Sequence, residues 1–133
     1  ARLDTRDLAL TTDSDRAAAD YNKGVTLMLS AWPGAAERFE AAIDADPDFA
    51  LAHAARARLH AICGESTKAK LRIAQAARLA ETHGDTRERN HVEVLSHAIH
   101  GRSREALTHT LAHLERWPAD AVILVCHDDA ALP

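Results

Sequence analysis

The sequence is poor in the residues on which several protein classes depend. Aromatic residues make up only 4% of its 133 residues, so small side chains must fill the core. It has two cysteines, Cys63 and Cys126, and neither lies in a CxxC pair, which argues against a disulfide framework and against a zinc–thiolate motif. We therefore expect a cytoplasmic protein in which Cys63 is a small buried side chain.

The charge and hydropathy patterns make two kinds of partner unfavourable. The formal net charge is -4, from 16 basic and 20 acidic side chains, and it provides no basic field that would attract a phosphate backbone. No segment approaches the run of about 18 apolar residues that a membrane span requires. We expect neither nucleic acid nor a membrane as partner.

Motifs for catalysis are also missing from the sequence. We find no GxSxG nucleophile motif, and neither cysteine lies in a recognisable catalytic signature. The stretch from Gly64 to Lys68 resembles a phosphate-binding loop, but it lacks the second glycine and follows a predicted helix rather than a strand. We expect no enzymatic activity and no cofactor.

Alanine clusters and helix start and stop signals are abundant instead. Alanine favours helices and allows helix axes to approach closely, and strand-forming runs are nearly absent. The signals predict helical hairpins over about residues 14–46, 48–82 and 86–117, then a lone helix over about 119–131. The expected fold is all-α, with about seven helices, an N-terminal arm at 1–13 and a helical domain at 14–133.

The hairpins repeat along the chain. Ala35, Ala69 and Ala106 are spaced by 34 and then by 37 residues. Ala69 and Ala106 each follow a glycine by five residues, and Ala35 and Ala106 each precede a proline by twelve. Self-similarity at a period of this length indicates a helical repeat architecture.

These residues resemble the signature of tetratricopeptide repeat (TPR) proteins. The matching positions are Gly24, Ala35, Phe39, Ala42 and Pro47 in the first repeat, Ala57, Gly64, Ala69 and Ala76 in the second, and Gly101, Ala106 and Pro118 in the third. The third repeat departs from the pattern at Thr110, where an aromatic is usual, and at His113, where alanine is usual. The resemblance implies a right-handed solenoid of stacked hairpins.

The resemblance also implies a function. In TPR proteins the first helices of successive hairpins line a concave groove that holds a peptide or partner protein. The repeat alignment places Tyr21, Arg58, Glu88 and His91 at groove positions. We therefore expect a protein-protein interaction module, with these four side chains as its partner-binding residues.

A finer resemblance bears on the C-terminal end. WPGAAERFEAAIDADPDFALAHA and TRERNHVEVL are similar to segments of bacterial relatives of tetratricopeptide repeat protein 38, which are much longer chains. The resemblance implies that this chain is an N-terminal part of such a protein. The apolar run from Ala121 to Val125 agrees, because a terminal helix this apolar needs a cover. We expect a homo-oligomer or a C-terminal continuation to supply it.

Histidines provide the alternative from a different class. His109 and His113 lie four residues apart, as do Glu93 and His97, and each spacing places both side chains on one face of a helix. If the two helices pair around Gly101, the four residues define a conceivable metal site. Packed, hydrogen-bonded histidines are the simpler interpretation of His97 and His113. A third alternative is a purely structural fragment of a longer TPR protein.

Overall fold

A computed structural model of the chain describes residues 2–3, 9–118 and 120, and in this part the fold is all-helical apart from one short pair of strands. The helices are α1 (Asp15–Leu29), α2 (Ala35–Ala45), α3 (Ala50–Ile62), α4 (Ser66–His83), α5 (Thr86–Ile99) and α6 (Ser103–Arg116). The strands β1 (Arg2–Leu3) and β2 (Ala9–Leu10) pair antiparallel, with Arg2 opposite Leu10. The sequence did not predict this pair.

Local signals in the sequence explain most of the helix boundaries. Ser14 caps α1 by accepting a hydrogen bond from the Ala17 amide at 3.1 Å, and Asp85 caps α5 by accepting one from the Glu88 amide at 2.9 Å. Gly64 and Gly101 have φ angles of 76° and 77°, which only glycine adopts without strain, and each ends the first helix of a hairpin.

The start of α3 has no side-chain cap. Phe49 occupies the N-cap position, and the Asp48 amide just before it donates to the Asp46 carboxylate at 3.2 Å. The predicted helix at 119–131 lies outside the described residues, apart from Asp120, which is not helical. The apolar run from Ala121 to Val125 lies outside them too.

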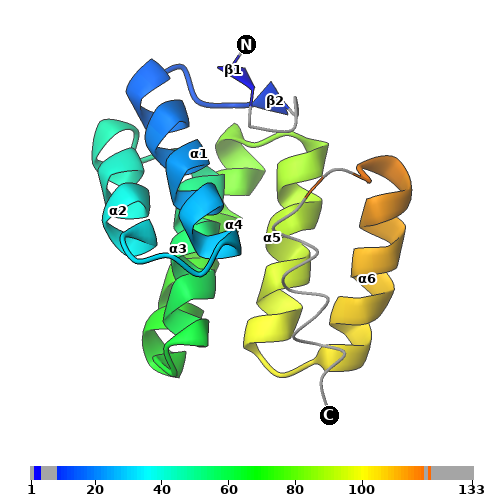
Figure 1. Cartoon of the computed structure of the whole chain (residues 1–133). Helices are drawn as coiled ribbons and strands as arrows, with labels where there is room; N and C mark the ends of the chain where they lie inside the picture. The colour runs from blue at the N-terminus through cyan, green and yellow to red at the C-terminus, as the bar shows by residue number, and fades with distance from the viewer. Residues whose placement is uncertain (1, 4–8, 119, 121–133) are drawn as a thin grey trace.

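The helices pack mainly against their neighbours in sequence. Within the hairpins, α1 contacts α2, α3 contacts α4 and α5 contacts α6, while α2–α3 and α4–α5 contacts join successive hairpins. In addition, α3 contacts both α1 and α5. Figure 1 shows the resulting row, from α1 and α2 through α3 and α4 to α5 and α6.

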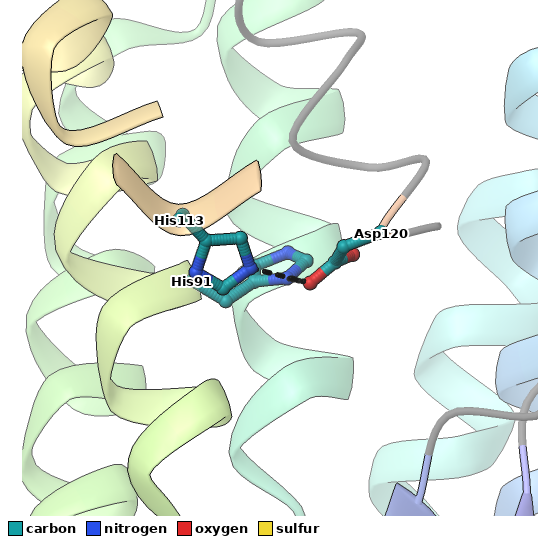
Figure 2. A group of neighbouring side chains, drawn as sticks. All are labelled: His91, His113 and Asp120. Atoms are coloured by element: carbon teal, nitrogen blue, oxygen red, sulfur yellow. Dashed lines mark hydrogen bonds and ion pairs between the residues drawn. The ribbon is translucent and has the colours of Figure 1, made fainter. Parts of the chain in front are cut away.

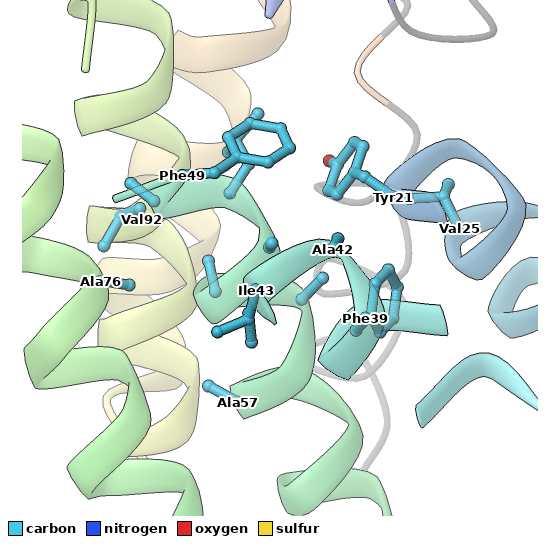
Figure 3. Close-up of a cluster of buried hydrophobic side chains, with 14 of the residues drawn as sticks. Tyr21, Val25, Phe39, Ala42, Ile43, Phe49, Ala57, Ala76 and Val92 are labelled. Atoms are coloured by element: carbon cyan, nitrogen blue, oxygen red, sulfur yellow. The ribbon is translucent and has the colours of Figure 1, made fainter. Parts of the chain in front are cut away.

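Small side chains fill the core, as the low aromatic content predicts. Ala42, Ala57 and Ala76 are fully buried, and Figure 3 shows Ala42 beside the Phe39 ring, with Ala57 and Ala76 farther from the aromatic rings. The Tyr21 ring lies 6.1 Å from the Phe39 ring and 5.2 Å from the Phe49 ring, measured between centroids. These contacts join α1 to α2 and to the start of α3.

The crossing of α1 and α2 depends on a glycine. A Cβ atom added at Gly24 would lie 2.6 Å from Cε1 of Phe39, closer than carbon atoms can pack. The absent side chain therefore allows the Phe39 ring to lie directly against the backbone of α1.

None of the helices in the described residues combines the length and the hydropathy that crossing a bilayer requires.

Cys63 is exposed, and the expectation that it is buried was wrong. It lies at the C-cap of α3, where the chain turns toward α4.

Candidate functional site

The four residues predicted to line a groove lie in the packed interior. Tyr21, Arg58, Glu88 and His91 are 3%, 5%, 0% and 1% exposed. They come from α1, α3 and α5, as the repeat alignment predicted, but they do not form an open surface. For Tyr21 the reason is its contact with the Phe39 and Phe49 rings, and for His91 it is a contact with Asp120.

Asp120 follows α6 and lies against the face of α5 that was assigned to the groove. One of its oxygens, Oδ2, accepts hydrogen bonds from His91 Nδ1 at 2.8 Å, His113 Nε2 at 2.9 Å and Arg87 Nη1 at 3.1 Å. Figure 2 shows the two imidazoles converging on this carboxylate from α5 and α6. All four side chains are at least 95% buried. The cluster is therefore a carboxylate-binding site built by the third hairpin, and Asp120 occupies it.

The electrostatics of this cluster favour an ionised carboxylate. Burial acts to raise the pKa of Asp120, but the charges and hydrogen bonds of His91, His113 and Arg87 outweigh it and hold that pKa well below its usual range. A fully buried carboxylate requires such partners, because an isolated one would be neutral.

Glu88 lies one residue from Arg87 on α5 and is buried in a less favourable setting. Its Oε1 accepts a hydrogen bond from the Thr11 hydroxyl at 2.6 Å, whereas Oε2 has no hydrogen-bond partner among the described residues. Burial, the largest effect, raises the pKa of Glu88, and the Thr11 hydrogen bond opposes it. The structure thus contains a carboxyl group whose charged form is disfavoured.

We expect Glu88→Gln to raise the free energy of unfolding at neutral pH by about 1 kcal/mol. Glutamine keeps an oxygen that accepts from Thr11 and removes the buried charge. Because the pKa of Glu88 is raised in the folded state, the wild-type protein loses stability as pH rises from the ordinary carboxyl pKa through the folded-state pKa. Urea unfolding of the wild-type protein and of Glu88→Gln at acidic and neutral pH measures the difference between their free energies of unfolding. This difference should be smaller in acid, where Glu88 is protonated.

The exposed Glu81 on α4 provides the matched control for this substitution. Glu81→Gln should change the free energy of unfolding by less than about 0.5 kcal/mol at either pH. If Glu88→Gln and Glu81→Gln changed the free energy of unfolding equally at both pH values, the raised pKa of Glu88 would be contradicted.

The predicted metal-binding residues are divided between two clusters. Glu93, His97 and His109 come together, with one donor atom from each within 4.8 Å of the others. His113 does not join them. It faces His91 and Asp120 instead, because its position on α6 is turned toward the chain that follows that helix.

Comparison with protein-family models, with curated proteins and with solved structures gave no match.

Sequence reasoning missed Asp120 as a site residue. The run from Thr86 to Arg89 could bind an acidic ligand, but a solvated helix start was the favoured interpretation, so Arg87 was not among the expected site residues. Asp120 fell inside the helix predicted over about 119–131. The Trp117-Pro118 pair was the available signal, since it showed that the chain leaves the helical direction just before Asp120.

Proposed function

We propose that this chain is a TPR-type scaffold that binds a polypeptide along the row of first helices, α1, α3 and α5. The observation that carries the proposal is the carboxylate site on α5. There, a segment of the same chain places its Asp120 side chain at a predicted groove position, against His91. A face that binds its own polypeptide in this way suits a partner with acidic side chains.

The packing supports the repeat assumed by this proposal. Each hairpin has a fully buried side chain at the equivalent position of its second helix, namely Phe39, Ile73 and Thr110. The corresponding positions of the first helices are Gly24, Ala57 and Val94, which lie 11, 12 and 12 residues before Ala35, Ala69 and Ala106, and all are buried. From the first hairpin to the third, the side chain on the first helix becomes larger and the side chain on the second helix becomes smaller. This is expected if the two side chains of each hairpin fill the same space between its helices.

The contacts between hairpins support the proposed row. α3 touches α1 on one side and α5 on the other, so the first helices form a continuous layer. Arg87 and His91 on α5 place donor groups along it, and both donate to the Asp120 carboxylate. Donors of this kind recognise carboxylates by charge-assisted hydrogen bonds.

The proposal includes a cytoplasmic location, where the isolated cysteines stay reduced.

Selection from a random peptide library displayed on phage tests this proposal. We expect acidic peptides to be enriched on the immobilised protein. Arg87→Gln should weaken their binding about tenfold, the effect of losing one hydrogen bond to a charged group, because Arg87 donates to the carboxylate at this site. Lys70→Gln removes the same charge from an exposed position on α4 and should change the affinity less than about twofold.

Two outcomes would contradict the proposal. Enrichment no greater than that on an unrelated helical protein would favour a purely architectural role. Equal effects of the two substitutions would place the peptide away from the row. Circular dichroism of both variants checks that they fold.

A further inference from the structure

We propose that Glu93, His97 and His109 form a binding site for a divalent transition metal such as zinc, linking α5 to α6. Glu93 and His97 are one turn apart on α5, and His109 faces them from α6. The site is separate from the carboxylate site and does not depend on the proposed peptide-binding function.

The distances fit a metal better than they fit direct hydrogen bonds. Oε1 of Glu93 lies 3.7 Å from Nε2 of His97 and 3.8 Å from Nε2 of His109. Both distances exceed the hydrogen-bonding range. Ligands of a tetrahedral zinc ion, with bonds of about 2.0–2.2 Å, are separated by about 3.3–3.5 Å. The His97 and His109 rings are stacked, with their centroids 4.8 Å apart, so the rings would have to turn to bring all three donor atoms to one ion.

The identity of the ligands indicates which metals would bind. Two imidazoles and one carboxylate suit zinc and neighbouring first-row metals, whereas magnesium and calcium prefer oxygen ligands alone. Three protein ligands leave at least one coordination position for water or for a group from another molecule.

The site is accessible to an ion from solvent. The side chains of Glu93, His97 and His109 are 53%, 18% and 45% exposed.

One contact opposes metal binding and makes the proposal more specific. Arg102 Nε donates a hydrogen bond to His97 Nδ1 at 2.9 Å, so a neutral His97 carries its proton on Nε2. A metal needs the lone pair on Nε2, and binding therefore requires His97 to change tautomer and Arg102 to release it. Arg102 is exposed and has room to move.

The other group of histidines is a weaker candidate for a metal. In that group, of His91, His113 and Asp120, the Arg87 guanidinium lies 3.1 Å from the carboxylate oxygen that a metal would need. Its buried positive charge would repel a cation and already neutralises Asp120.

Calorimetric titration of the whole chain with zinc chloride tests the proposal. We expect one zinc ion per chain and a rise in melting temperature, because the ion binds the folded state. His109→Ala should weaken binding about tenfold or more. His83→Ala is the matched control, since its side chain is 47% exposed and lies outside the cluster. It should leave the affinity unchanged.

Arg102→Ala provides a test in the opposite direction. Removing the competing hydrogen bond, worth about 0.5–1.5 kcal/mol, should tighten zinc binding about two- to tenfold. If the histidines only pack against each other and bind no metal, Arg102→Ala should not increase the affinity for zinc. Absence of saturable binding, binding that survives His109→Ala, or equal losses in His109→Ala and His83→Ala would overturn the proposal.

Discussion

Replacing Asp120 with alanine is expected to lower the free energy of unfolding by about 3–5 kcal/mol, the usual cost of removing one partner from a buried ion pair. Arg87, His91 and His113 all donate to the same carboxylate oxygen, and all would remain buried without it. Urea unfolding at neutral pH measures the loss. Asp44→Ala, at an exposed position on α2, is the control and should cost less than about 0.5 kcal/mol.

The pH dependence of this loss has a definite sign. Because the pKa of Asp120 is depressed in the folded state, its contribution is fully present above the ordinary carboxyl pKa and declines as pH falls toward the folded-state value. The wild-type protein and Asp120→Ala should therefore approach each other in stability only in strong acid. A difference between them that is the same across the acid range would contradict the depressed pKa.

The same variant tests whether the site recognises carboxylates. Acetate added in place of chloride at constant ionic strength should restore part of the lost stability, because the anion can occupy the vacated position between the three donors. Asp44→Ala should show no such response. A stability of Asp120→Ala that is identical in acetate and chloride would contradict a carboxylate-binding site.

Phe39→Ala is expected to lower the free energy of unfolding by about 3–5 kcal/mol. The Phe39 side chain is fully buried between α1 and α2, and its removal would leave a cavity beside Gly24 and Tyr21. Denaturant unfolding measures the loss. Leu71→Ala, at a side chain that is 69% exposed, should change stability by less than about 1 kcal/mol, and a similar cost at both positions would contradict the packing.

A double-mutant cycle at this crossing tests the equivalence of the hairpins. Gly24→Ala with Phe39→Ile gives the first hairpin the pair that the second has at Ala57 and Ile73. Each single change should destabilise, by overpacking and by a cavity respectively. The double variant should be more stable than their sum by at least about 1 kcal/mol. Additive effects would show that the two positions do not share one space.

The helices were largely predictable because their determinants are local. Ser14 and Asp85 cap helices within a few residues of their own positions, and Gly64 and Gly101 end helices by adopting a conformation that other residues avoid. The closeness of Glu93, His97 and His109 was predictable as well. It follows from helical spacing and from one short turn between two antiparallel helices.

The remaining features depend on contacts that are distant in sequence. Thr11 reaches Glu88 across 77 residues, and Asp120 reaches Arg87 across 33. Neither contact leaves a periodic signal. For the same reason the alignment assigned Glu88 and His91 to a groove and gave no indication that they are buried.

Chemical-shift mapping by NMR tests the central claim most directly. The probe is the acidic peptide most enriched in the selection, titrated into the isotopically labelled protein. The account predicts that the largest amide shift changes fall on α1, α3 and α5 and extend to the residues around Asp120, whose carboxylate the peptide must displace. Changes confined to α2, α4 and α6, or no saturable change at all, would contradict it.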